Sequence, residues 1–216
     1  MNVLVLCGDY WHPAEVVQRG LADFPAGDVR FDFVEDAKDI LTPALLDDYD
    51  VIMNCKMDCI SAANQHEWFQ PGVTEVMPAD LRAWVERGGG FLAVHGGTSF
   101  YREDTSGYID LVGNHFVSHP PRCDIRFHIA ADHPITRGIP DFTYRDEQYQ
   151  LATLAPDLEV LATTRSEAGG EQLGCFVRHP GAGRLCVLTP GHILETWRRP
   201  EFRQLLEQAL RWCAGD

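Results

Sequence analysis

The chain contains 216 residues, of which 45% are hydrophobic and 23% are charged. This is the composition of a globular protein, and a chain of this length buries roughly 70% of its unfolded surface without help from disulfides. The net charge is -14, from 18 basic and 32 acidic residues. So acidic a chain repels phosphate backbones and anionic lipids, and we therefore expect neither nucleic acid nor a membrane among its partners.

The N-terminus and the cysteines indicate the compartment. The chain opens on a short apolar run without the basic segment of a signal peptide, and no run approaches the ~18 apolar residues of a membrane span. Seven cysteines, an odd number, are scattered along the chain. Buried free thiols in a reducing compartment explain this usage, and we expect a cytoplasmic protein. Cys55 and Cys59 have CxxxC spacing, a weak zinc signal because no second pair accompanies it.

Eight short runs rich in Val, Leu, Ile and Phe predict β-strands. In chain order they are Val3–Leu6, Val29–Val34, Val51–Cys55, Gly90–Val94, Ile125–Ile129, Leu158–Ala162, Leu173–Val177 and Leu185–Leu188. Their near-continuous apolarity is typical of strands buried on both faces, as in a parallel sheet.

Three amphipathic stretches, at 13–21, 78–88 and 200–212, each open on proline and predict helices. The strand–helix–strand–helix order of the first hundred residues predicts right-handed crossovers and an open α/β sheet. The stretch from about 113 to 172 is richer in strands and turns, and we expect it to form an antiparallel extension. No repeat or linker is visible, so we expect a single domain over 1–216.

Polar residues that follow the predicted strands are the first candidates for a site, because ligands of open α/β sheets bind beyond the carboxyl ends of the strands. His12 lies in the loop after the first strand, His95 directly follows the Gly90–Val94 strand, and His192 follows the last strand. The loop after the Val51–Cys55 strand, which contains Lys56, carries none, so three of these four loops carry a histidine. We expect these histidines to gather at one edge of the sheet.

The segment around His95 is the most informative. An apolar strand, one reactive-type residue and two glycines form the pattern of a nucleophile elbow, with His95 at its apex and Gly96 and Gly97 behind it. Imidazole is poorly suited to acyl-enzyme chemistry, but it binds metals and transfers protons. We therefore expect His95 to be a metal ligand or an acid–base group.

Five segments carry a family pattern. They are Gly88–Gly97, Gly113–Phe116 with His119-Pro120, Asp132–Ile139, Asp146–Tyr149, and Thr189–His192 leading into the helix Trp197–Trp212. Together they resemble the ThuA-like family of trehalose-utilisation proteins. The resemblance implies the flavodoxin-type fold of class I glutamine amidotransferases: an open, mostly parallel sheet with helices on both faces. It also implies a role in bacterial carbohydrate catabolism, beside sugar dehydrogenases that make 3-keto sugars.

One departure from the amidotransferases bears on activity. Those enzymes place cysteine at the elbow and a His–Glu pair late in the chain, whereas this chain has His95 at the elbow and keeps His192 and Glu195 late. The nucleophile is missing, so we expect no glutaminase activity.

The resemblance and the residue types together give the following site. We expect His95, His192 and Glu147 to be catalytic, and His12, His95 and His192 to bind a divalent metal such as Zn²⁺. The residues expected to contact a substrate, a small carbohydrate or keto sugar, are Asp9, Trp11, Lys56, Gly96, Thr98, His115, Tyr149 and Glu195. Without a metal, pairs such as His95 with Glu147 or His192 with Glu195 could pass protons next to a ketone.

Two other interpretations remain open. The chain could be a non-catalytic sugar-binding or regulatory module on an amidotransferase-like scaffold. A flavodoxin-like nucleotide carrier is the weakest interpretation, because the Gly88–Gly90 run precedes a strand, whereas a phosphate loop follows one. We also expect a homodimer, from family habit and from the aromatic-rich segment 66–71.

Overall fold

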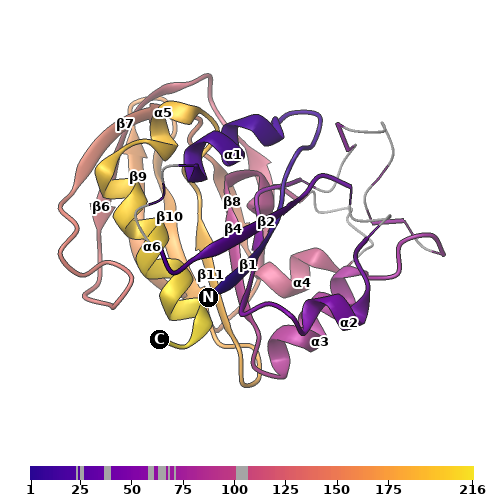
Figure 1. Ribbon diagram of the computed structural model, residues 1–216. Helices are drawn as coiled ribbons and strands as arrows, with labels where there is room; N and C mark the ends of the chain where they lie inside the picture. Colours follow the sequence, from indigo (N-terminus) through magenta and orange to yellow (C-terminus); the bar gives the residue numbers. More distant parts are fainter. Residues whose placement is uncertain are drawn as a thin grey trace.

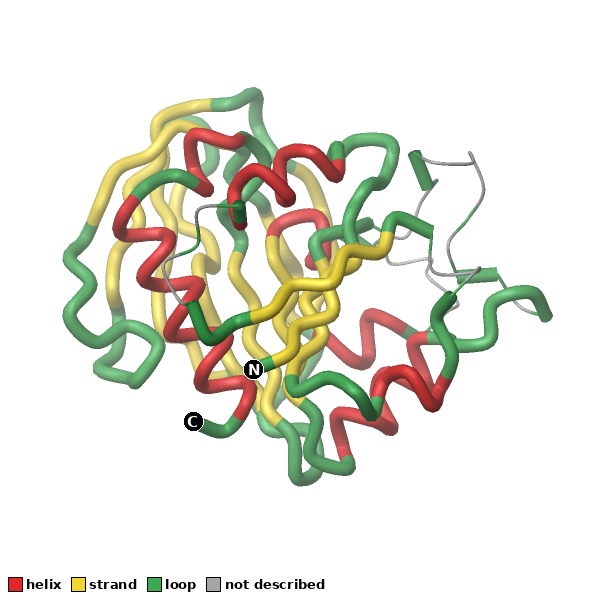
Figure 2. Tube along the Cα trace, viewed as in Figure 1, coloured by secondary structure: helices red, strands yellow, loops and turns green. Residues whose placement is uncertain are grey.

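The computed structural model describes residues 1–22, 24, 27–36, 40–57, 61–62, 67, 69–70, 72–100 and 107–216. Its centre is one mixed sheet in the order β2-β1-β3-β4-β11-β10-β9-β6-β7, and β5 and β8 form a separate pair. Figures 1 and 2 show this sheet running through the molecule with helices packed on both sides of it. The predicted fold class, a mostly parallel α/β sheet with an antiparallel extension, is confirmed.

The bounds of the elements are as follows. The strands are β1 Asn2–Leu6, β2 Arg30–Val34, β3 Val51–Asn54, β4 Gly90–Val94, β5 Asn114–Ser118, β6 Cys123–Ile129, β7 Phe142–Asp146, β8 Gln150–Thr153, β9 Glu159–Ser166, β10 Gly170–Arg178 and β11 Arg184–Leu188. The helices are α1 Ala14–Leu21, α2 Pro43–Leu46, α3 Pro78–Glu86, the 3₁₀ helix η2 His95–Thr98, α4 Tyr108–Val112, α5 Leu194–Trp197 and α6 Pro200–Ala214.

Alternation along the central strands explains why helices cover both faces. In β1, Val3 and Val5 pack into one hydrophobic cluster with α1 and α6, while Leu4 and Leu6 join a second cluster with α3 and α4. Successive strand residues point to opposite faces, so an uninterrupted apolar run feeds two cores at once. The continuous runs therefore predicted this part of the sheet correctly.

Pairing is parallel among β1 to β4 and β11, as predicted. It is antiparallel for β6 and β9, which lie in the stretch expected to form the antiparallel extension, and the expectation of a parallel strand is wrong for β10. β10 runs antiparallel to both β11 and β9, and β6 runs antiparallel to β9 and β7. In β6 only alternate residues such as Ile125 and Phe127 are buried, because this part of the sheet exposes one face. β5, β7 and β8 lie within the strand-rich region expected from the sequence, although none was placed individually.

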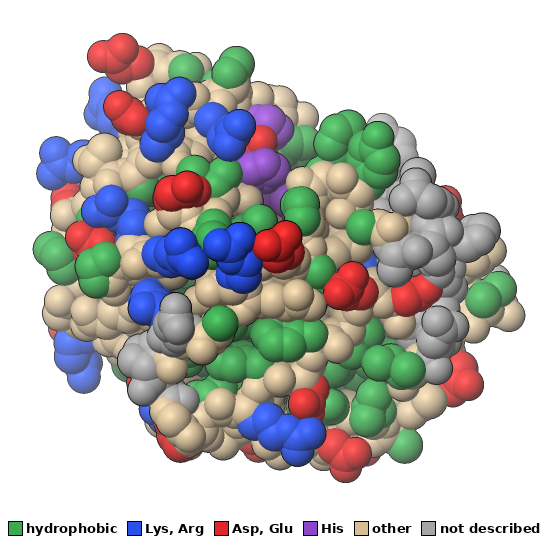
Figure 3. Space-filling view, turned by 45° about the horizontal axis from the view of Figure 1, so that its top comes forward, with side chains coloured by type: hydrophobic (Ala, Val, Ile, Leu, Met, Phe, Trp, Pro, Cys, Tyr) green, Lys and Arg blue, Asp and Glu red, His purple; other side chains and the backbone are tan. Residues whose placement is uncertain are grey.

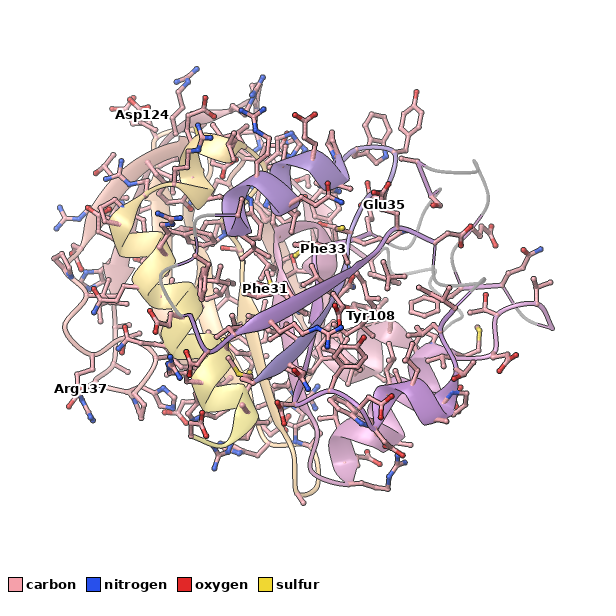
Figure 4. The ribbon with its side chains drawn as sticks, in the orientation of Figure 1. Phe31, Phe33, Glu35, Tyr108, Asp124 and Arg137 are labelled. Atoms are coloured by element: carbon pink, nitrogen blue, oxygen red, sulfur yellow. The ribbon has the colours of Figure 1, made fainter. Side chains whose placement is uncertain are left out.

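β2 also departs from the expectation of burial on both faces. It is an edge strand, and along it only Val34 is buried. Figure 4 shows Phe31 and Phe33 on this strand at the rim of the sheet. Phe31 packs edge-on against Phe24, with ring centroids 5.3 Å apart, while Phe33 stays exposed.

The structure bears on three expectations: free cysteines, the absence of a membrane span, and a homodimer. Six cysteines lie in its described part and all six are free thiols, as expected; Cys59 lies outside it. Within the described residues, no helix combines the length and apolar character that a membrane crossing requires. The homodimer stays a prediction, and its argument is weaker, because Phe69 is only 3% exposed and His66 and Trp68 lie outside the described residues.

Candidate functional site

The parallel strands bring the three predicted histidines to one place. β1, β3, β4 and β11 are parallel neighbours, so the segments after their carboxyl ends share one edge of the sheet. One donor atom each from His12, His95, His192 and Glu147 lies there, all within 4.8 Å of one another. In the space-filling view, purple histidine side chains reach the surface beside a red acidic one (Figure 3).

His95 has the backbone of an elbow. Among the described residues it alone combines a side chain with a positive φ, 46°, a conformation that is uncommon outside glycine and that marks functional turns. A Cβ on Gly97 would lie 2.0 Å from the carbonyl oxygen of Asn54, and one on Gly96 would lie 2.7 Å from that of Cys55. The two glycines are therefore needed for the loop to pack against β3.

Hydrogen bonds fix the tautomers of two histidines. Nδ1 of His95 lies 2.8 Å from the carbonyl oxygen of Thr189, and Nδ1 of His12 lies 2.7 and 2.9 Å from the two carboxylate oxygens of Asp9. Those oxygens only accept, so each Nδ1 carries the hydrogen. In the neutral rings both Nε2 atoms are left as acceptors facing the centre of the cluster.

His192 and Glu147 complete the cluster. The Oε2 atom of Glu147 lies 3.2 Å from Nδ1 of His192 and 3.6 Å from Nε2 of His95, and these two nitrogens are 3.2 Å apart. Burial, together with the neighbouring His95, lowers the pKa of His192 to about 4, so His192 is neutral at pH 7. Burial would raise the pKa of Glu147, but the interactions of its carboxylate with His95 and His192, in the protonated forms that these rings adopt at acidic pH, outweigh it and lower that pKa to about 2.

Asp146, for which the sequence predicted no separate role, holds the His192 loop. Its fully buried Oδ2 accepts hydrogen bonds from the backbone N–H groups of Gly191 and His192, at 3.1 and 3.2 Å, and from the Thr196 hydroxyl at 2.7 Å. Glu147 is its chain neighbour. The Asp146 carboxylate at the end of β7 therefore anchors the loop that carries His192, and it is adjacent in the chain to Glu147.

Tyr149 bridges two of the histidines. Its hydroxyl lies 3.0 Å from Nε2 of His12, and its ring is tilted by 30° to that of His95, with centroids 4.0 Å apart. Burial raises the pKa of Tyr149 well above its usual range, and a hydrogen bond from Ser99 only partly offsets this. The side chain is therefore a neutral phenol at pH 7.

A pocket of about 230 Å³ opens over the cluster. Its lining residues are Trp11, His12, Met57, Ser99, Phe116, His119, Glu147, Tyr149 and His192. Trp11 is 59% exposed and forms part of the aromatic wall, where the sequence had placed a substrate contact. His119, which belongs to the family pattern but not to the expected site residues, reaches the same pocket, and its Nε2 lies 3.6 Å from Oε2 of Glu147. The four-residue spacing from His115 did not predict that His119 lies in the pocket.

Six of the eight expected substrate contacts do not line this pocket, and the side chains of three of them, Lys56, His115 and Glu195, are engaged or exposed elsewhere. Lys56 is only 1% exposed, and its ammonium group donates to the backbone carbonyl of Glu35. Nδ1 of His115 donates to the neighbouring carbonyl of Phe116, at 3.3 Å. Glu195 lies exposed in the first turn of α5 and lines a different hollow, so the carboxylate beside His192 is Glu147 and not Glu195.

Three others support the site from behind. Asp9 is buried against His12. Thr98 donates its hydroxyl to the carbonyl oxygen of His95, at 2.7 Å. Gly96 leaves room for the His12 ring, since a Cβ there would lie 2.8 Å from its Nδ1. These three residues hold His12 and His95 in position and do not themselves line the pocket.

A mostly parallel α/β sheet with a strand-to-helix elbow has the fold of the amidotransferase-like proteins, and in this chain the elbow carries His95 beside a cluster of imidazoles. The chain belongs to the ThuA family, described as trehalose utilisation, whose model matches residues 2–213. A comparison with proteins of curated function finds no match.

Solved structures agree on the fold. A ThuA-like protein from Parabacteroides merdae has a TM-score of 0.77 at 15% identity, over 99% of this chain and 90% of that one. One from Bacteroides uniformis has a TM-score of 0.74 at 17% identity, over 99% and 91%. A GMP synthase component from Thermoplasma acidophilum has a TM-score of 0.60 at 14% identity, over 100% and 94%. At these identities the likeness concerns the fold alone.

Proposed function

We propose that this protein is a metal-dependent enzyme that acts on a small carbohydrate derivative, with a keto sugar as the substrate class. His95, His192 and Glu147 would hold a divalent transition metal such as Zn²⁺. The observation that carries the proposal is the mutual spacing of these three donor atoms, 3.2, 3.2 and 3.6 Å, beside a pocket that Glu147 and His192 line.

The three residues fit a metal on two grounds. Ligands about 2.0–2.1 Å from a tetrahedral Zn²⁺ lie about 3.3 Å from one another, close to the three spacings here. A metal-binding histidine typically donates its second N–H to a carbonyl or carboxylate, as His95 does to Thr189. Two imidazoles and one carboxylate are also the donor set of catalytic zinc sites that keep an open position.

The pocket suits a sugar-sized substrate. Trp11 and Phe116 offer aromatic surface for a sugar ring, while Ser99 and His119 offer polar groups for its hydroxyls. A metal in this site would polarise a substrate carbonyl. The family's association with trehalose utilisation supports a carbohydrate as the substrate, and the absence of cysteine at the elbow argues against glutaminase activity.

Elemental analysis tests the proposal. The protein is produced without an affinity tag in zinc-supplemented medium, and its metal content is compared with that of His95→Gln, His192→Gln and Glu147→Gln. We expect one ion per wild-type chain, loss of the ion in these variants, and retention in Glu195→Gln, a matched control at the exposed carboxylate of α5. A wild-type protein that neither carries nor takes up a stoichiometric metal would contradict the metal. It would leave the non-catalytic sugar-binding module as the better account.

A further inference from the structure

His12 differs from the other members of the cluster in what its inward nitrogen contacts. Nε2 of His12 lies 3.0 Å from the Tyr149 hydroxyl. In the neutral ring with Nδ1 protonated, this nitrogen can only accept, so the Tyr149 hydroxyl donates to it. The lone pair that a metal would need is thus already engaged, whereas His95 and His192 face each other and Glu147.

We propose that Asp9, His12 and Tyr149 form a proton relay, separate from the metal ligands, through which Tyr149 takes a proton from the bound substrate. This inference rests on the proposed function for its substrate. It assigns to His12 a role other than the metal ligand expected from the sequence.

The relay begins at a carboxylate that is fixed in place. Asp9 is buried, and it accepts hydrogen bonds from the backbone N–H groups of Trp11 at 2.7 Å, His12 at 2.9 Å and Met57 at 2.7 Å. Both of its oxygens also contact Nδ1 of His12. Asp9 is therefore a positioning residue that sets the tautomer of His12 and balances a positive charge on that ring.

The other end of the relay opens into the pocket. His12 and Tyr149 both line it, and the Tyr149 ring is held against the ring of His95. A carboxylate, an imidazole and a hydroxyl in this order repeat the hydrogen-bonding logic of the Ser-His-Asp triad, with a phenol in place of the serine. In this order the phenol oxygen takes the place of the triad member that reacts with the substrate.

The step balances within the relay. A proton leaves the substrate carbon next to the carbonyl group and joins the phenol oxygen of Tyr149, while the hydroxyl proton of Tyr149 passes to Nε2 of His12. The electron pair of the broken C–H bond moves onto the carbonyl oxygen, giving an enolate. His12 becomes an imidazolium beside the Asp9 carboxylate, Tyr149 remains a neutral phenol, and the reverse transfer returns the proton.

Two measurements on the same proteins test the relay. Exchange of the carbon-bound hydrogen next to the carbonyl of methyl 3-keto-α-D-glucopyranoside is followed by NMR in D₂O, with the buffer rate subtracted. Metal content is measured on the same samples. For Tyr149→Phe and His12→Gln we expect exchange to fall about 100-fold or more, with the metal retained. Asp9→Asn should slow exchange and also keep the metal.

Controls separate the relay from the metal site. Tyr144→Phe removes a phenol hydroxyl from β7 outside the pocket and should exchange like the wild type. His192→Gln should lose the metal. Wild-type exchange that survives Tyr149→Phe, or loss of the metal in His12→Gln, would overturn the relay alone. Absence of exchange by the wild type would overturn the relay and the proposed function together.

Discussion

Nδ1 of His95 lies 2.8 Å from the carbonyl oxygen of Thr189, across 94 residues of sequence. This contact joins the elbow after β4 to the segment after β11. Those two strands are parallel neighbours, from Arg184 beside Gly90 to Leu188 beside Val94. Because their register is fixed, His95 and the His192 loop leave the sheet at the same level. The site thus depends on close packing of backbone at the elbow.

A single methyl group at the elbow tests that dependence. Gly97→Ala places a Cβ 2.0 Å from the backbone oxygen of Asn54, which cannot swing aside as a side chain could. We expect the free energy of unfolding to fall by about 1–3 kcal/mol, measured by urea denaturation. Gly27→Ala, where a Cβ meets nothing within 4 Å, is the control and should change it by less than about 0.5 kcal/mol. Equal stability of the two variants would refute the clash.

Asp146 gives a second prediction, on the His192 loop. Asp146→Ala leaves the buried N–H groups of Gly191 and His192 without their acceptor. We expect a loss of about 3 kcal/mol in unfolding free energy, since hydrogen bonds to charged groups contribute about 1.5–3 kcal/mol each. Zinc affinity, measured by competition with a chelator, should fall about 10–100-fold. Asp124→Ala, at an exposed carboxylate on β6, should change neither quantity, and unaltered zinc affinity in Asp146→Ala would show that the loop needs no anchor.

The decline of the unfolding free energy at acidic pH should depend on Asp141. Hydrogen bonds from His128 and from the backbone N–H of Ile129, helped by Arg126, lower the pKa of Asp141 to about 2. A lowered pKa stabilises the fold above the unfolded value of about 3.9, and this contribution is lost as the pH falls through about 2. The side chain is 27% exposed, so we expect at most about 1 kcal/mol.

Asp141→Asn should therefore lower stability at pH 7 and flatten its decline between pH 4 and pH 2, as followed by thermal unfolding. Asp132→Asn, an exposed carboxylate 3.9 Å from Arg137, serves as the control and should keep the wild-type slope. A slope unchanged in Asp141→Asn would contradict the assignment.

Thiol reactivity gives a fourth prediction. Burial raises the pKa of Cys7 to about 12, and it raises the pKa values of Cys55 and Cys186 well above their usual range. Little thiolate forms at these positions, whereas Cys123 is partly exposed. Among the six described cysteines, iodoacetamide at pH 8 should modify Cys123 first in the native protein, as read by peptide mass spectrometry. Rapid native labelling of Cys7 would contradict the burial.

The sequence allowed part of the site to be predicted, for a simple physical reason. His12, His95 and His192 each follow a buried parallel strand, and the carboxyl ends of such strands meet at one edge. Glu147 was reached through the family pattern, because β7 pairs antiparallel at the far end of the sheet and no strand-end rule leads from it to the cluster. Asp146 was overlooked for the same reason.

The structure places two expected site residues away from the pocket, because the direction of a side chain depends on local packing. The likeness to the late His–Glu pair of the amidotransferases implied a pair of His192 and Glu195, but α5 begins at Leu194 and leaves Glu195 exposed. Lys56 is one of two lysines and follows β3. Its side chain is nevertheless buried, and its ammonium group donates a hydrogen bond to the backbone carbonyl of Glu35. Strand-end position predicts which edge a residue occupies. It does not predict whether the side chain faces the pocket or the protein interior.

The most direct test of the account is anomalous diffraction at the zinc absorption edge from crystals of the untagged wild-type protein grown with Zn²⁺. We predict one strong peak within bonding distance, about 2.0–2.2 Å, of Nε2 of His95, Nδ1 of His192 and a carboxylate oxygen of Glu147, with Nε2 of His12 still bonded to Tyr149. A peak elsewhere, or no peak among these residues under saturating zinc, would contradict the metal site at the centre of this account.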